Sequence, residues 1–288
     1  MFKRAVITDE ISQDLDIAVE MASQFGLDQL EIRSVWETRI DEMSPEQLRR
    51  IRETAEGRGL SVAGLAAPFL KCELGSDDEY AEHLEILNRC IAAGQILGTS
   101  LIRGFTFWKR DGLDEHYQQI LDAYAEPARI ARKEGVTIGI ENEASCYVGT
   151  GAELARFLGD LNEPAVRAVW DPANACWEGS EKTWADGYPG VKPYIAHVHV
   201  KDKRQEGPNE GPVAVVIGDG EVDIPGQLQA LKDDGYAGCV SLETHYRVTH
   251  RLDEDIARMP GGSAFSEGGE EGTRRCLVAW NQMMAVLA

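Results

Sequence analysis

The segment Val136–Asp171, VTIGIENEASCYVGTGAELARFLGDLNEPAVRAVWD, holds two short apolar runs with a helical stretch between them. Both runs have the length and composition of buried strands. Each stops on an acidic residue, Glu141 in the first case and Asp171 in the second. Between them, Thr150 and Glu153 have the spacing of a helix capping box. This order predicts a βαβ unit, two parallel strands joined by an outer helix.

The same alternation extends through the rest of the chain, with apolar runs about 25 to 40 residues apart, the length of a strand, a helix and two loops. The predicted strands are Arg4–Thr8, Gln29–Arg33, Leu60–Ala66, Ser100–Phe105, Val136–Glu141, Arg167–Asp171, Ile195–Val200 and Cys239–Glu243. No G-x-G-x-x-G motif follows the first of them, which disfavours a dinucleotide-binding fold. No shift in composition divides the 288 residues. We therefore predict one α/β domain over residues 1–288, a (β/α)8 TIM barrel with a parallel sheet.

Local signals place the ends of several helices. Ser44-Pro45-Glu46-Gln47 combines a capping box with proline at the first helical position, and Ser76 with Glu79 repeats the box. After the eighth strand, residues 248–272 include the glycine-rich stretch PGGSAFSEGGEEG at 260–272. We interpret this region as a mobile loop before a last helix that ends near Leu287. A more specific hypothesis is that the loop covers the site as a lid.

Composition excludes several classes of protein. The chain has 29 basic and 49 acidic residues, a formal net charge of −20, whereas binding to nucleic acid or to an anionic membrane surface needs a basic face. The start MFKRAVITDE lacks the apolar core of a signal peptide, and the nearly uncharged run Cys90–Ile102 is too short to span a bilayer. Six cysteines without a C-x-x-C pair predict reduced, buried thiols in a cytoplasmic protein.

The last four predicted strands each end on a side chain of a type that binds metals: TIGIE on Glu141, RAVWD on Asp171, IAHVH on His199 and CVSLE on Glu243. A single carboxylate at a strand end is readily explained as a helix cap, but in a barrel all four surround one mouth. Three clustered carboxylates repel one another unless a cation lies between them. The pattern predicts one divalent metal ion, with Mn²⁺ favoured and Mg²⁺, Co²⁺ or Zn²⁺ as alternatives.

The choice of His199 over His197 follows from the pleat of the strand. Residues two apart point to the same face, and His199 lies nearer the C-terminal mouth. We therefore predict that His199 is the ligand and that His197 lies one layer deeper, where it packs in the barrel or orients another group.

Several motifs extend over nearly the whole chain: Glu31-Ile32-Arg33, Glu141-Asn142, Trp170-Asp171-Pro172-Ala173-Asn174, His197-Val198-His199-Val200-Lys201-Asp202, Gly218-Asp219-Gly220-Glu221-Val222-Asp223 and Leu242-Glu243-Thr244. Together they resemble the xylose-isomerase-like sugar phosphate isomerase/epimerase superfamily. The resemblance implies that Glu141, Asp171, His199 and Glu243 bind one divalent ion. It also implies that Glu141 and Glu243 flank the substrate as acid and base.

Two positions depart from the pattern of ketose 3-epimerases in this superfamily. Those enzymes carry a histidine three residues after the ligand aspartate and an arginine six residues after the ligand histidine. This chain has Asn174 and Gln205 there, with Arg204 beside the latter. The departures disfavour simple 3-epimerisation of a free ketose.

Further side chains near the strand ends are candidate substrate contacts: Arg33, Arg103, Glu143, Asn174, Lys201, His245 and Trp108. The cationic groups suit hydroxyl, carboxylate or phosphate groups, and an aromatic ring suits the wall of a sugar pocket. Ion pairing with nearby acids, or plain packing, explains the same residues equally well at this stage.

We therefore expect a divalent-metal-dependent isomerase or epimerase of a small sugar, keto-sugar or sugar phosphate, which removes a proton next to a carbonyl through a metal-stabilised ene-diolate. Loss of a β-hydroxyl from the same intermediate would make it a lyase, of the inosose dehydratase, 3-dehydroshikimate dehydratase or keto-glycoside lyase type. A non-catalytic sugar-binding barrel is the second alternative. The expected partner is a small carbohydrate, and the resemblance implies a homo-oligomer.

Overall fold

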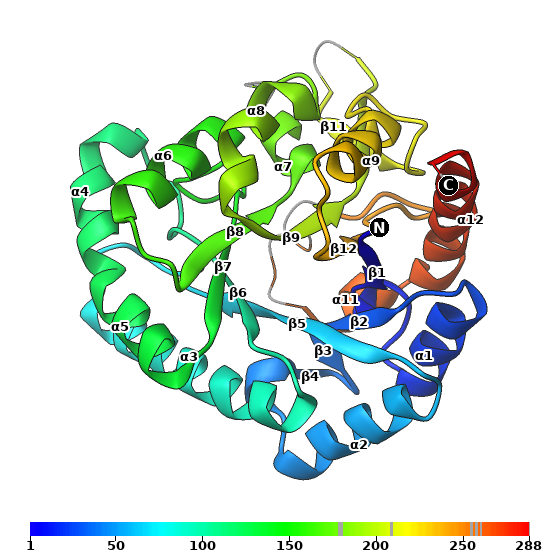
Figure 1. Cartoon of the computed structure of the whole chain (residues 1–288), viewed down its shortest axis with the longest axis horizontal. Helices are drawn as coiled ribbons and strands as arrows, with labels where there is room; N and C mark the ends of the chain where they lie inside the picture. The colour runs from blue at the N-terminus through cyan, green and yellow to red at the C-terminus, as the bar shows by residue number, and fades with distance from the viewer. Residues whose placement is uncertain (178–180, 208–209, 254–255, 257–258, 260, 288) are drawn as a thin grey trace.

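The computed structural model describes residues 1–177, 181–207, 210–253, 256, 259 and 261–287. Its central sheet has eight strands in the order β1-β12-β9-β8-β7-β6-β5-β2, paired in parallel (Figure 1). The strands are β1 Lys3–Val6, β2 Gln29–Ile32, β5 Ser61–Phe69, β6 Leu101–Gly104, β7 Thr137–Glu141, β8 Val166–Trp170, β9 Ile195–Val200 and β12 Cys239–Leu242. All eight predicted strands are present, and the largest difference is the end of β5, at Phe69 instead of Ala66.

An isolated parallel bridge between Ile7 and Glu31 joins the C-terminal ends of β1 and β2. These are the two edge strands of the sheet, so the bridge brings the sheet close to a closed barrel. The predicted TIM-barrel fold is confirmed.

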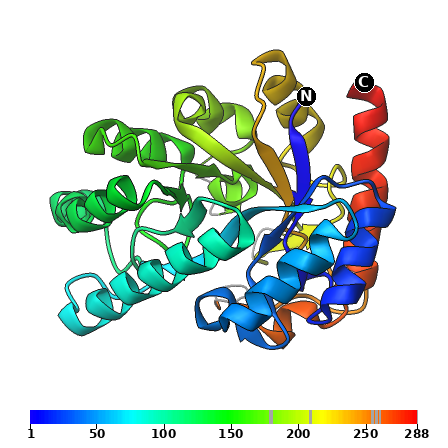
Figure 2. The ribbon, with the colours of Figure 1, turned by 60° about the horizontal axis from the view of Figure 1, so that its bottom comes forward.

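Helices surround the strands (Figures 1 and 2). They are α1 Leu15–Gln24, α2 Pro45–Glu56, α3 Asp77–Leu97, α4 Leu113–Ala123, α5 Ala125–Glu134, α6 Gly151–Leu161, α7 Pro172–Trp177, α8 Trp184–Val191, α9 Ile224–Asp233, α11 Ser263–Ser266 and α12 Gly269–Leu287, with 3₁₀ turns η1 Thr8–Glu10, η2 Ile40–Glu42 and η3 Lys192–Tyr194. Two small antiparallel ladders stand at strand ends, β3 Ser34–Val35 with β4 Thr38–Arg39 and β10 Asp202–Gln205 with β11 Pro212–Val215. Within the described ranges, no helix combines the length and apolar character that crossing a bilayer requires.

The predicted capping boxes form in two of three cases. Both reciprocal bonds are present at Ser44 in α2 and at Thr150 in α6. At α3 only half of the box exists: Ser76 accepts from the Glu79 backbone, whereas the Glu79 carboxylate accepts from the Glu73 backbone. The prediction of a full box there is wrong because the Glu79 side chain satisfies a loop amide instead.

The region 248–272 contains more regular structure than the sequence suggested. Helix α11 lies inside it, and α12 begins at Gly269, before the predicted boundary. An added Cβ at Gly269 would lie 2.2 Å from the Glu10 carbonyl oxygen. The absence of a side chain at this glycine therefore allows α12 to pack closely against η1. Residues 254, 255, 257, 258 and 260 lie outside the described residues, and the mobile loop stays a prediction.

All six cysteines are buried and unpaired, in agreement with the prediction of buried thiols. The interior of the barrel is unusually polar for this fold, in which packed aliphatic layers are the rule. Buried charged side chains include Glu31, Arg33, Arg103, Glu141, Asp171, His197, His199, Lys201 and Glu243. Charges this deep need partners, and those partners define the site.

Candidate metal centre

Strand geometry brings the predicted ligands together. Glu141 is the last residue of β7, Asp171 follows β8, His199 is in β9 and Glu243 follows β12. In the sheet, β12, β9, β8 and β7 are consecutive neighbours. One donor atom from each of these four side chains lies within 4.8 Å of the others, and all four residues are buried.

The imidazole of His199 faces two of the carboxylates. Its Nδ1 lies 3.1 Å from Glu141 Oε1 and 3.9 Å from Glu243 Oε2. Nδ1 is therefore the ring nitrogen that faces these two predicted ligands.

Three cationic side chains pair with the carboxylates of this cluster. Arg103 Nη1 donates to Glu141 Oε2 at 3.0 Å, and Arg33 Nη1 donates to Glu243 Oε1 at 3.0 Å. Lys201 Nζ donates to Asp171 Oδ2 and, at 2.6 Å, to Glu243 Oε2. The structure thus places Arg33, Arg103 and Lys201 against the predicted ligands, and a direct contact with substrate stays a prediction for each.

The electrostatics of the cluster are those of crowded carboxylates. Burial opposes ionisation of Glu141, but Arg103 and His199 lower its pKa to about 2. Burial raises the pKa of Asp171, and although Lys201 opposes this, Glu141 and Glu243 add to the rise. The ion pair with Lys201 therefore does not offset the combined effect of burial and of the two neighbouring carboxylates on the pKa of Asp171.

The donor set fits a divalent cation. It combines three carboxylates with one imidazole, and oxygen-rich sets of this kind suit Mn²⁺, Mg²⁺ or Co²⁺. A divalent ion would relieve the repulsion from Glu141 and Glu243, which adds to the effect of burial in raising the pKa of Asp171. The donors also come from four different strand ends, so the barrel itself brings them together.

Two asparagines form hydrogen bonds with the predicted ligands. Asn174 Nδ2 donates to Glu141 Oε1 at 3.2 Å, and its backbone N–H donates to Asp171 Oδ1 at 2.9 Å. Asn142 Oδ1 accepts from the Asp171 backbone at 3.0 Å, and its Nδ2 donates to the Asp171 carbonyl at 2.8 Å. Asn174, predicted to contact substrate, is thus engaged by two predicted ligands.

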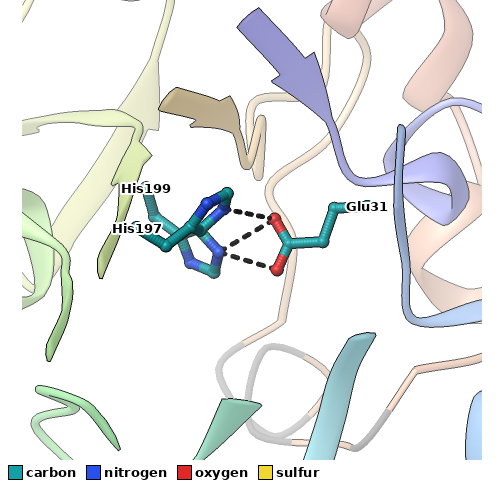
Figure 3. A group of neighbouring side chains, drawn as sticks. All are labelled: Glu31, His197 and His199. Carbon is teal, nitrogen blue, oxygen red and sulfur yellow. Dashed lines mark hydrogen bonds and ion pairs between the residues drawn. The ribbon is translucent and has the colours of Figure 1, made fainter. Parts of the chain in front are cut away.

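Glu31 is a further residue of this region to which the sequence analysis assigned no role. Its carboxylate lies 3.0 Å from His197 Nε2 and 3.0 Å from His199 Nε2 (Figure 3). His197 lies one layer deeper in β9 than His199, as the spacing predicted, and it belongs to this second group of donors. The sequence did contain a signal for this placement. Glu31 lies two residues before Arg33, so both side chains point to the same face of the strand.

A second wall of the mouth contains Lys71, which the sequence reading missed. Its Nζ lies 3.4 Å from Glu143 Oε2, 4.7 Å from the centre of the Phe105 ring and 5.3 Å from that of Trp108. Lys71 thus joins two predicted substrate contacts, Glu143 and Trp108. A cation held over aromatic faces is stabilised by the ring quadrupoles.

Glu10 and His245 extend the charged cluster beyond Glu243. His245 Nε2 lies 3.5 Å from Glu10 Oε1 and 3.6 Å from Glu243 Oε1. Arg33 Nη2 donates to Glu10 Oε1 at 2.8 Å and Arg247 Nη2 donates to Glu10 Oε2 at 3.1 Å. Burial opposes ionisation of Glu10, but His245, Arg247 and Arg33 lower its pKa to about 2.

We predict that Glu10 makes folding stability depend on pH. Because its pKa is lower in the folded chain than the ordinary 4.5, its contribution is fully present above about pH 4.5 and is lost as the pH falls toward 2. The expected contribution is about 3 kcal/mol. Denaturant titrations of the wild type and Glu10→Gln should therefore differ most at neutral pH and converge toward pH 2. A difference in unfolding free energy that stays constant from pH 7 to pH 3 would contradict this.

Comparison with known proteins defines the class. The family model of the xylose isomerase-like TIM barrel matches residues 19–268, and the chain belongs to this family. A curated relative, an inosose dehydratase of Serratia proteamaculans (strain 568), is 28% identical over 189 residues, 58% of this chain and 62% of the relative. The chain thus matches less than two thirds of that protein's length.

Solved structures share the fold at lower identity. The probable 3-DHS dehydratase involved in petrobactin synthesis from Bacillus anthracis has a TM-score of 0.75 at 16% identity, covering 97% of this chain and 99% of its own. D-psicose 3-epimerase from Clostridium cellulolyticum H10 has a TM-score of 0.75 at 19% identity, covering 99% of each chain. The named relatives therefore include both epimerases and dehydratases.

Proposed function

We propose that this protein is a divalent-metal-dependent enzyme that removes a proton next to the carbonyl of a small polyhydroxylated compound. In this proposal Glu141 and Glu243 act as acid and base, and the product of the first candidate function is an isomer or epimer of a sugar, keto-sugar or sugar phosphate. The observation that carries the proposal is the convergence of Glu141, Asp171, His199 and Glu243 within 4.8 Å at the mouth of the barrel.

Those four residues would hold the metal, with Mn²⁺ favoured. When bound, a divalent cation acts as a Lewis acid and stabilises the negative charge that develops on a substrate oxygen after the proton is lost. Its ligands are all buried, so the charge develops where water screens it little.

The side chains around the two glutamates favour the ionised form of both. Burial resists ionisation of Glu243, but Lys201, His245 and His199 hold its pKa well below the ordinary value, and the pKa of Glu141 is about 2. Both carboxylates are therefore ionised at neutral pH, which is the form that accepts a proton. A glutamate that has taken the proton can return it to the substrate as the acid.

The second candidate function is dehydration, in which the intermediate loses a β-hydroxyl. The match to inosose dehydratases, at 28% identity, is the observation that favours it. Proton removal by Glu141 or Glu243 is common to both reactions, so the four donors support them equally. In a sugar-binding barrel without catalysis, the two glutamates would serve only as metal ligands.

Incubation in D₂O with Mn²⁺ tests the proposal directly. We expect that a panel of ketoses, inososes and sugar phosphates includes one that takes up solvent deuterium next to its carbonyl, seen by NMR. An unchanged product mass, after correction for deuterium, identifies isomerisation or epimerisation. Loss of one water identifies dehydration. Binding of a sugar without any exchange would reject an enzymatic role in favour of the binding barrel.

A further inference from the structure

We propose that Glu31 is a positioning residue of the metal centre. In this role its carboxylate keeps the proton of the His199 imidazole on Nε2, so that the Nδ1 lone pair faces Glu141, Asp171 and Glu243. His197 holds that carboxylate in place from the layer below. The inference rests on the proposed metal-dependent function, and it assigns tasks to two residues outside the ligand set.

The geometry around Glu31 is that of an acceptor shared by two donors. His199 Nε2 lies 3.0 Å from Glu31 Oε1 and 3.1 Å from Oε2, while His197 Nε2 lies 3.0 Å from Oε2 (Figure 3). The two imidazole rings are 5.3 Å apart with an interplanar angle of 85°. All three side chains are at most 2% exposed, so water does not compete for these bonds.

Proton counting gives the direction of the bonds. An ionised carboxylate only accepts hydrogen bonds, and a neutral imidazole carries one N–H. Glu31 places one carboxylate 3.0 Å from the Nε2 atom of each imidazole, so the hydrogen of each bond has to come from the imidazole. A neutral His199 bonded to it therefore carries its hydrogen on Nε2 and presents a lone pair at Nδ1, which is what a metal ligand needs.

Glu31 is needed because the opposite tautomer has a partner as well. Glu141 Oε1 lies 3.1 Å from His199 Nδ1 and would accept a hydrogen there. That arrangement removes the lone pair from the side of the other ligands. Glu31 accepts the same hydrogen on the far nitrogen, where it does not interfere with a metal.

The fold explains how Glu31 reaches across the barrel. It lies on β2, and the sheet order separates β2 from β9 by β1 and β12 along the shorter path. Beside Glu31 the pairing of β2 with β5 is irregular, since Leu30 pairs with Val62 but Glu31 pairs with Gly64. Such irregularities re-aim side chains. The Ile7–Glu31 bridge then fixes the Glu31 backbone at the seam of the barrel.

Glu31→Gln tests the role with little change in shape. The amide keeps one acceptor oxygen, replaces the other with an NH₂ donor and carries no charge, so it holds the two imidazole N–H groups less firmly than the carboxylate does. Titration calorimetry of the chelator-stripped full chain with Mn²⁺ alone should show the affinity falling about 10–100-fold, the usual effect of losing an orienting partner. As a matched control, Glu181→Gln alters a buried glutamate outside both donor groups, which accepts from the Ala152 backbone. Its Mn²⁺ affinity should equal that of the wild type.

A spectroscopic readout tests the inference in the wild type as well as in the variant. In ¹⁵N imidazole spectra of the wild type loaded with diamagnetic Mg²⁺, His199 should carry its hydrogen on Nε2, and Glu31→Gln should shift that population. A His199 with hydrogen on Nδ1 in the loaded wild type overturns the inference even if Glu31→Gln does not fold. So does a folded Glu31→Gln chain with wild-type Mn²⁺ affinity. A wild type that takes up no Mn²⁺ overturns the proposed function itself, and this role with it.

Discussion

Replacing Glu243 with glutamine should lower turnover on the substrate found by deuterium exchange by at least 10²–10⁴-fold, on the order of one positioned acid or base. The amide cannot accept the substrate proton, and it is a poorer partner for a divalent ion. Arg33 and Lys201 both donate to Glu243, so the variant also loses the charge that these two buried cations face. We therefore expect a lower unfolding free energy as well. Turnover should be measured well below the melting temperature, at saturating Mn²⁺.

Glu141→Gln is the partner experiment. Glu141 pairs with Arg103 and His199 on the other side of the cluster, and the same loss of turnover is expected. Glu181→Gln serves as the control for loss of a buried carboxylate, with turnover close to that of the wild type. If either Glu141→Gln or Glu243→Gln turned over substrate at the wild-type rate, the scheme with two carboxylates would be wrong.

Removing the metal should strongly reduce both turnover and thermal stability. Dialysis against a chelator should abolish turnover, and Mn²⁺ should restore it. Because a ligand that binds only the folded chain stabilises it by about 2.7 kcal/mol at 100 times its Kd, added Mn²⁺ should raise Tm by roughly 5–10 °C for a domain of this size. Calorimetry and elemental analysis measure the two effects.

Asp171→Asn is the matched control for that shift. The substitution keeps the shape of the side chain and removes one predicted ligand charge, so added Mn²⁺ should raise Tm far less than in the wild type. Asp171 also pairs with Lys201, and the starting Tm of the variant must therefore be compared with its own chelated form. A wild type that contains no metal after exposure to Mn²⁺ and gains no thermal stability would refute the metal centre.

Much of the candidate site could be predicted from the local pattern of apolar strands and the residues that end them. Glu141, Asp171, His199 and Glu243 end four apolar strands, and parallel strands in a barrel bring their C-terminal ends to one mouth. The two-residue spacing of His197 and His199 placed them in different layers of one face. These inferences need only the strand period and the handed order of βα units, and both are properties of the chain.

Other features depended on contacts that no spacing encodes. Lys71 and Glu143 are paired, yet they follow different strands. The capping box at Ser76 is incomplete because the Glu79 carboxylate accepts a hydrogen bond from the backbone N–H of Glu73 in the preceding loop. The early start of α12 reflects a backbone contact between Gly269 and η1.

By itself, the sequence determined the barrel and the four side chains at its mouth, because hydrophobic period and strand-end position are local. Only the tertiary structure decided what each charge faces. It placed Lys201 between Asp171 and Glu243, and it turned Glu31 inward to two histidines of a distant strand. The physical reason is that buried charges are stabilised by partners within a few ångströms. Those partners come from strands far apart along the chain, and the strand order alone does not say which side chains meet across the barrel.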